Sequence, residues 1–202
     1  MRYKLLRDMV AIPSFSRQEG EVADLVCSWI EEKGVQYKRM GNNILLHKGC
    51  GKDGAPSLLL NSHIDTVKPS PKYTFDPFTP PYHPERIDGL GSNDAGGSAF
   101  ALLHTFLHYL NEELPLNLGL ILSAEEECSG EDGIASLSSY ISENYDFAII
   151  GEPTCMRAAV GERGLLVLDG TAHGVTVHAA RDEGVNAIDI AINFTTSLKN
   201  IR

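Results

Sequence analysis

The chain has 202 residues, of which 43% are hydrophobic and 22% charged, so it can form a packed core and is neither disordered nor fibrous. Its 17 basic and 27 acidic residues give a formal net charge of -10, which disfavours binding to nucleic acid or to an anionic membrane surface. An acidic excess also supplies carboxylates that can hold a metal ion.

Cellular location is indicated by what the sequence lacks. The N-terminal segment has no apolar region typical of a secretory signal, and no apolar run reaches the roughly 20 residues of a membrane span. The four cysteines are sparse and no pair has C-x-x-C spacing. These features predict a cytoplasmic protein with reduced cysteines and no membrane partner.

Helix and strand patterns alternate along most of the chain. Apolar residues recur at helical spacing in three segments, 21–33, 96–110 and 134–142. Apolar runs predict four strands, over 43–47, 57–61, 116–122 and 147–150. Segment 68–84 is rich in proline and aromatic residues and predicts an irregular surface loop. This alternation is typical of an α/β sandwich.

The pattern changes after Glu152. Segments 165–168 and 171–176 predict adjacent strands, and segment 186–198 predicts a helix. We therefore expect residues 1–158 to form most of one α/β domain and residues 159–202 to begin a second domain.

Residues of metal-ligand type follow three of the predicted strands directly. His63 and Asp65 follow the second strand, Glu125–Glu127 the third and Glu152 the fourth. In open α/β sheets, ligands bind outside the carboxyl ends of the strands. The sequence therefore predicts that these side chains meet at one edge of the sheet.

Each of these patterns has its own chemistry and its own structural alternative. Asp65 lies two residues after His63, where a carboxylate can orient the imidazole, although a capping aspartate also fits. The acids of Glu125–Glu127 repel one another unless a cation or a proton compensates, although helix N-termini also favour acids. Asp94 lies in a glycine-rich turn where a helix begins, a position that suits either a ligand or a cap.

Together these residue types match the requirements of a two-metal hydrolase. One carboxylate bridges two ions, further side chains bind each ion, and an unligated glutamate acts as the general base.

Several segments in order resemble the signature motifs of a known zinc metallopeptidase family, which includes acetylornithine deacetylase, succinyl-diaminopimelate desuccinylase, aminoacylase and carboxypeptidase G. These segments are Ile12–Ser14 with Glu19, Ser62–Val67, Gly91–Gly97, Ala124–Glu127, Gly151–Thr154, His178–Ala180 and Gly184–Ile188. The Gly151–Thr154 segment is most similar to acetylornithine deacetylase and its succinyl-specific relatives. The resemblance implies a three-layer α/β/α catalytic domain followed by the start of an α+β lid or dimerisation domain.

The resemblance also implies roles for individual residues. His63 and Glu152 would bind one zinc, Asp94 would bridge, and Glu127 would bind the second zinc, with cobalt as an alternative metal. Asp65 would orient His63. Glu126 would take a proton from the attacking water and deliver it to the leaving amine.

The resemblance makes His178 a lid-domain residue. In a homodimer of the complete protein, His178 would support the oxyanion in the partner's active site. The family's second zinc takes a further histidine from a segment beyond the length of this chain. We therefore expect an incomplete catalytic domain with weak activity, an uncovered apolar sheet surface and a tendency to associate.

The resemblance predicts an amidohydrolase that removes the acyl group from a small-molecule N-acyl amino acid. N-Acetylornithine or N-succinylornithine, in arginine biosynthesis, is the first expectation for the substrate. Succinyl-diaminopimelate desuccinylase and a small dipeptidase or carboxypeptidase are alternatives. A noncatalytic fragment that acts as a metal-binding module is an alternative of another class, and a two-metal nuclease or phosphatase is disfavoured by the net charge.

Overall fold

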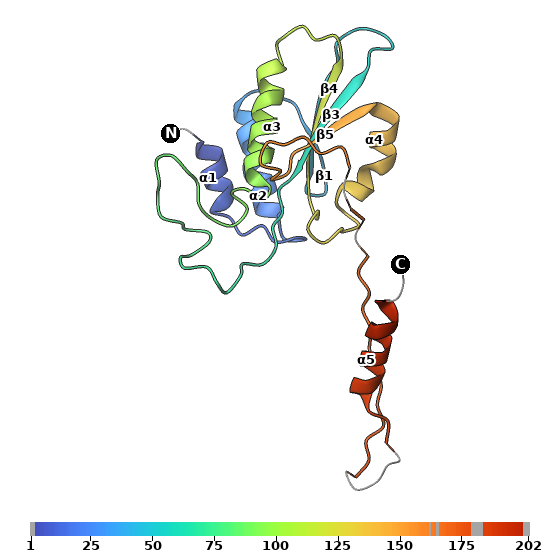
Figure 1. Ribbon diagram of the computed structural model, residues 1–202. Coiled ribbons are helices and arrows are strands. Elements are labelled where there is room, and N and C mark those ends of the chain that lie inside the picture. Colours follow the sequence, from blue (N-terminus) through green and yellow to red (C-terminus); the bar gives the residue numbers. More distant parts are fainter. Residues whose placement is uncertain (1–2, 162, 165, 179–183, 200–202) are drawn as a thin grey trace. The chain divides into compact units, whose positions relative to one another are not determined.

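Figure 1 shows the computed structural model of the chain, which describes residues 3–161, 163–164, 166–178 and 184–199. The chain divides into two compact units, Met1–Ala158 and Ala159–Arg202. Among the helices described, none combines the length and the apolar character that a membrane crossing requires.

A mixed sheet of five strands forms the centre of the first unit. The strand order is β1-β2-β4-β3-β5, with β1 Lys38–Met40, β2 Asn43–Lys48, β3 Ser57–His63, β4 Asn117–Ser123 and β5 Phe147–Ile150. Strand β3 runs parallel to β4 and β5, whereas β2 is antiparallel to β1 and β4. The four strands predicted for this unit are present. Strand β1 was not predicted, because this short, largely polar segment has no apolar pattern that would indicate a strand.

Both faces of the central strands are buried. Leu60 of β3 and Leu120 of β4 belong to the larger apolar cluster, and Leu59 and Ile121 belong to a smaller one. Successive residues of a strand point to opposite faces, so neighbouring leucines contribute to different clusters. Burial on both faces explains why these strands are continuous apolar runs.

Helices cover both faces of the sheet. On one face, the larger cluster includes residues of α1 Lys4–Val10, α2 Gly20–Glu32 and α3 Gly96–Tyr109. On the other face, the 3-10 helix η1 Ile134–Leu137 and α4 Ser138–Asn144 pack on the smaller cluster. The expected three-layer α/β/α arrangement is confirmed, and segment 68–84 contains neither helix nor strand, as predicted.

The second unit contains helix α5, Ala187–Leu198. Its N-terminus is capped by Asn186, whose side-chain oxygen accepts a hydrogen bond from the N–H of Ile188 at 3.0 Å. The strands predicted over 165–168 and 171–176 are not formed by the described residues of these segments. Their one described pairing is an isolated bridge between Val175 and Val185.

Exposure explains why this strand prediction was wrong. Leu166, Val167 and Leu168 are between 58% and 79% exposed. Apolar alternation stabilises a strand only when neighbouring strands and a packed face bury it. Leu165 lies outside the described residues.

Candidate metal centre

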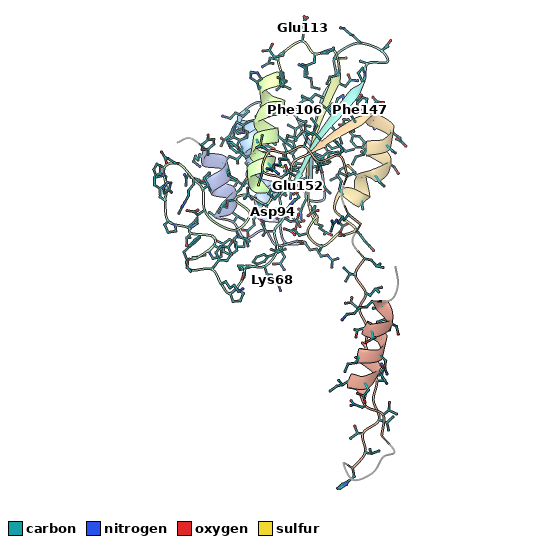
Figure 2. All side chains as sticks on the ribbon, in the orientation of Figure 1. Lys68, Asp94, Phe106, Glu113, Phe147 and Glu152 are labelled. Atoms are coloured by element: carbon teal, nitrogen blue, oxygen red, sulfur yellow. The ribbon has the colours of Figure 1, made fainter. Side chains whose placement is uncertain are left out.

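The carboxyl ends of three parallel strands lie at the same edge of the sheet. His63 of β3 pairs with Ser123, the last residue of β4, and Asn61 pairs with Ile150, the last residue of β5. The acidic segment Glu125–Glu127 and Glu152 follow directly after these strand ends. Figure 2 shows Asp94 and Glu152 close together below the sheet.

His63 is the central residue of this edge and is only 1% exposed. Its Nδ1 lies 2.9 Å from the backbone carbonyl oxygen of Asp65 and 3.5 Å from the Asp65 carboxylate. Because a carbonyl oxygen can only accept, Nδ1 carries the proton and donates it to this carbonyl. Nε2 therefore points to the opposite side of the ring, and its lone pair becomes available to a metal ion when this nitrogen gives up its proton.

Carboxylates face this lone pair. His63 Nε2 lies 3.2 Å from Asp94 Oδ1 and 3.8 Å from both Glu126 Oε2 and Glu152 Oε2. Ligand atoms of His63, Asp94 and Glu152 all lie within 4.8 Å of one another. A lone pair opposite carboxylate oxygens is repulsive unless a proton or a metal ion lies between them.

Proton affinities at the cluster agree with this need for a cation. Burial lowers the pKa of His63, but the hydrogen bond and charge of Asp65 and the charge of Glu152 outweigh it and raise the pKa to about 9. Burial raises the pKa of Glu127, and the neighbouring charge of Asp94 raises it further. An imidazole among carboxylates is a donor set that suits zinc or cobalt, so these residues fit a first-row divalent ion.

Glu127 lies beside the cluster rather than in it. It is absent from the group of three ligand atoms within 4.8 Å, although Asp94 is its largest electrostatic neighbour. Glu152 shares this environment, because burial raises its pKa while the charge of His63 opposes the rise. Asp94 thus contacts His63 at 3.2 Å and also acts electrostatically on Glu127.

Asp65 is fully buried and holds the acidic segment by its backbone. Its Oδ1 accepts the N–H of Glu126 at 3.0 Å, and its Oδ2 accepts the N–H of Glu127 at 3.2 Å and the hydroxyl of Ser16 at 2.7 Å. Burial alone would raise the pKa of Asp65, but the interactions with His63, Ser16 and the two N–H groups outweigh it and hold the pKa below its ordinary value. An ionised Asp65 therefore connects His63 to the acidic segment.

The glycine-rich turn positions Asp94 at the start of α3. The N–H of Gly96 donates to the carbonyl oxygen of Gly91 at 2.9 Å. A Cβ atom on Gly96 would lie 2.5 Å from that same oxygen, so only glycine permits this close approach. The side chain of Asp94 is 56% exposed, which leaves it accessible to an ion and to a substrate.

His178 belongs to the second unit, and its role in catalysis stays a prediction. Two positioning residues were missed by the sequence interpretation. Ser16 lies inside the early Ile12–Glu19 motif, which the resemblance marks without assigning Ser16 a role. Ser62 precedes His63, and its hydroxyl donates to the carbonyl oxygen of Gly151 at 2.8 Å, which fixes the segment that carries Glu152.

Comparisons with known proteins place the chain among related sequences. The family profile described as Peptidase family M20/M25/M40 matches residues 59–195. An acetylornithine deacetylase of Proteus mirabilis is 29% identical, over 98% of this chain and 54% of that protein. A probable carboxypeptidase of Aspergillus clavatus is 30% identical, over 96% of this chain and 50% of that protein. The chain spans about half the length of these relatives.

Solved structures share the fold. A tripeptidase from Staphylococcus aureus aligns with a TM-score of 0.63 at 19% identity, over 95% of this chain and 54% of that one. A Bacillus subtilis protein described as a dinuclear metal binding peptidase from M20 family aligns with a TM-score of 0.54 at 17% identity, over 72% of this chain and 40% of that one.

Proposed function

The chain belongs to peptidase family M20/M25/M40, and on this basis we propose that it is part of a metal-dependent amidohydrolase that removes the acyl group from an N-acyl amino acid. The observation that carries the proposal is the position of His63 Nε2, which faces the carboxylates of Asp94 and Glu152 at 3.2 and 3.8 Å. N-Acetylornithine or N-succinylornithine is the proposed substrate, in arginine biosynthesis. Similarity to an acetylornithine deacetylase over 98% of the chain supports this choice.

Two zinc ions are the proposed cofactors, with cobalt as the alternative. His63 and Glu152 would hold one ion, Asp94 would bridge, and Glu127 would hold the other. When bound, the ions would lower the pKa of a water molecule and polarise the amide carbonyl. The dinuclear site named for the similar Bacillus subtilis protein supports a pair of ions.

Glu126 is the proposed general base. It would take a proton from the attacking water and return it to the nitrogen of the leaving amine. Its side chain is 49% exposed, so substrate can reach it, while Asp65 fixes its backbone N–H at 3.0 Å. A fixed backbone and an accessible carboxylate are the properties that a proton-transferring residue at the edge of the cluster needs.

We also propose a role for the second unit. In a homodimer of the complete protein, His178 would donate a hydrogen bond to the oxyanion that forms at the partner's site. The cytoplasm is the proposed location. The dimer and the role of His178 rest on the resemblance of the motif around His178.

A small carboxypeptidase or dipeptidase is a second candidate. The probable carboxypeptidase of Aspergillus clavatus is as similar to this chain as the deacetylase is, at 30% identity. Both reactions cleave a linear amide by attack of water, so His63, Asp94 and Glu126 serve either one. The groups that bind the acyl chain and the amino-acid carboxylate separate the two, and substrate comparison is the test.

Metal stoichiometry of the purified chain tests the proposal. Wild-type chain is compared with Asp94→Ala and with Asp53→Ala, a matched control in the exposed β2–β3 loop. Hydrolysis of acetylornithine, succinylornithine and a dipeptide is assayed on the same samples. We expect the wild type and Asp53→Ala to bind zinc and Asp94→Ala to lose it.

The outcomes separate the candidates. Zinc binding that survives Asp94→Ala contradicts the proposed metal site. Turnover of the dipeptide in preference to both acyl-ornithines favours the peptidase. Zinc bound without turnover of any substrate favours a metal-binding module over an enzyme for this length of chain.

A further inference from the structure

The acidic loop, residues 124–132, begins where β4 ends and carries the proposed general base and one proposed metal ligand. Two of its residues have a left-handed backbone conformation that is uncommon outside glycine, because φ is 53° at Glu125 and 48° at Ser129. Such conformations cost free energy and persist only where the surrounding structure fixes them. The acidic loop therefore needs contacts from outside itself, and the carboxylate of Asp65 supplies only those in its middle.

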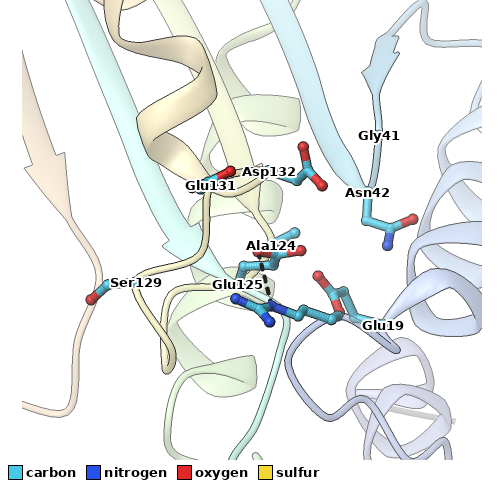
Figure 3. Close-up of a pocket in the computed structure, with 9 residues that line it drawn as sticks. Glu19, Gly41, Asn42, Ala124, Glu125, Ser129, Glu131 and Asp132 are labelled. Carbon is cyan, nitrogen blue, oxygen red and sulfur yellow. Dashed lines mark ion pairs between the residues drawn. The ribbon is translucent and has the colours of Figure 1, made fainter.

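The two ends of the acidic loop lie together. A Cβ atom on Gly133 would lie 2.6 Å from the carbonyl oxygen of Ala124, so only glycine permits this approach. Figure 3 shows Ala124 and Asp132 facing Asn42 across a hollow that all three residues line. Strand β2 is antiparallel to β4, so its first residue, Asn43, lies at the edge of the sheet where the acidic loop begins.

The side chain of Asn43 bonds to both ends of the acidic loop. Asn43 is 0% exposed, its Oδ1 accepts the N–H of Ala124 at 2.9 Å, and its Nδ2 donates to the carbonyl oxygen of Asp132 at 2.7 Å. Nδ2 also donates to the carbonyl oxygen of Met40 at 3.1 Å. Both hydrogens and the oxygen of the amide thus have partners, which fixes the orientation of the amide. Asn43 therefore joins the two ends of the loop to each other and to β2.

Truncation of Asn43 would leave backbone groups at both ends of the loop without this partner. Ala124 is only 1% exposed, so water has little access to replace the lost acceptor of its N–H group. Asp132 is an exposed residue, so its carbonyl oxygen can turn toward water instead. We therefore expect the loop to open from the Asp132 end, which lets the left-handed residues between the two ends relax.

We propose that Asn43 is a positioning residue, which holds the acidic loop in the conformation that presents Glu126 and Glu127 to the metal centre. The three hydrogen bonds of its side chain go to backbone groups, so Asn43 acts on these carboxylates through the backbone of the loop. The roles of Glu126 and Glu127 rest on the proposed function, whereas the hold of Asn43 on the loop rests on hydrogen bonds alone.

Cobalt binding to the purified chain, followed by the visible absorption of the bound ion, tests the role of Asn43 at the metal centre. We expect Asn43→Ala to weaken cobalt binding about tenfold and to change the absorption spectrum, because the carboxylate of Glu127 is no longer held in place. Unchanged cobalt affinity and spectrum in Asn43→Ala would overturn the proposal.

Asn117→Ala is the matched control, because Asn117 holds the β2–β3 loop in the same way at the opposite edge of the sheet. Its Oδ1 accepts the N–H of Cys50 at 2.9 Å, and its Nδ2 donates to the hydroxyl of Ser57 at 3.1 Å. Asn117→Ala should lower the urea midpoint of unfolding and leave the cobalt affinity and spectrum unchanged. The same change of spectrum in both variants would assign Asn43 a purely structural role.

Amide hydrogen exchange of the metal-free chain tests the hold on the loop separately from metal binding. In Asn43→Ala, the N–H groups of Glu126 and Glu127 should exchange about tenfold faster relative to the N–H of Leu120 in β4, whereas in Asn117→Ala they should not. The comparison with Leu120 removes the effect of a general loss of stability. Equal relative exchange in the wild type and Asn43→Ala would overturn the proposal.

Wild-type chain decides the case in which Asn43→Ala does not fold. The N–H groups of Ala124, Glu126 and Glu127 should then open as one unit, with a common protection that rises when cobalt is added. Independent opening of Ala124 would overturn the proposal. A wild-type chain that binds no cobalt would contradict the proposed metal centre itself, and the exchange rates would still decide whether Asn43 holds the loop.

Discussion

The Oδ1 atom of Asp65 accepts the backbone N–H of Glu126 at 3.0 Å, although the two residues are 61 positions apart. The same carboxylate holds the N–H of Glu127 through Oδ2. Asp65 therefore fixes the acidic loop, while its own carbonyl oxygen, and not its carboxylate, is the nearest acceptor for His63 Nδ1. One buried aspartate sets the position of both the imidazole and the loop.

Replacing Asp65 tests this anchoring role. Asp65→Ala removes the acceptor of two backbone N–H groups and of Ser16, and buried donors without partners are unfavourable. We expect a loss of about 3 kcal/mol in the free energy of unfolding, measured with urea, together with weaker zinc binding. Asp88→Ala, which removes an exposed ion pair with Arg86, is the control and should change stability little. Equal stabilities of the two variants would contradict the anchoring role.

The variant Glu126→Gln tests whether Glu126 acts as a general base or as a metal ligand. Glu126 is proposed to move a proton and not to bind metal, so the variant should keep the zinc stoichiometry of the wild type. Where hydrolysis is measurable, its rate should fall by about 100-fold or more. Glu152→Gln should instead reduce zinc binding. Loss of zinc in Glu126→Gln would assign Glu126 to the ligands.

From the burial of Glu19 we predict that the wild type and Glu19→Gln differ in stability by an amount that depends on pH. Burial raises the pKa of Glu19 above its ordinary value of 4.5, against the opposing effect of nearby backbone N–H groups. The carboxyl group of Glu19 therefore binds its proton more tightly in the folded chain than in the unfolded chain. The stability that this protonation contributes is present below pH 4.5 and is lost as the pH rises through the folded-state pKa.

The corresponding measurement compares Glu19→Gln with wild type by urea unfolding across this pH range, without added cation. The amide side chain of the variant does not titrate, so the variant should gain stability relative to the wild type as the pH rises. A difference that stays constant with pH would show that Glu19 ionises normally in the folded chain.

The edge strand β5 predicts self-association. Phe147, Ile149 and Ile150 are 64%, 51% and 54% exposed, and β5 is the last strand of the sheet. An exposed apolar strand with an unpaired edge favours pairing with another chain. Sedimentation velocity should show association that depends on concentration. Ile149→Lys should reduce it, whereas Ser142→Lys, which adds the same charge on exposed α4, should not.

The sequence by itself determined the layers of the first unit and the edge of the sheet at which the candidate metal ligands lie. Apolar periodicity depends on neighbours a few positions away, so α2, α3 and the central strands could be read locally. The positions of His63, Glu127 and Glu152 could be predicted because the carboxyl ends of parallel strands share one edge.

Only the tertiary structure determined which distant residues contact the residues of the site. The bond from Ser16 to Asp65 joins residues 49 positions apart, and no local pattern specifies it. The burial of Glu19 likewise depends on how the segment before α2 packs on the loop after β4. The strand prediction over 165–168 was wrong for the same reason, since a strand is stabilised by the neighbours that pair with it, and those neighbours are chosen by the fold.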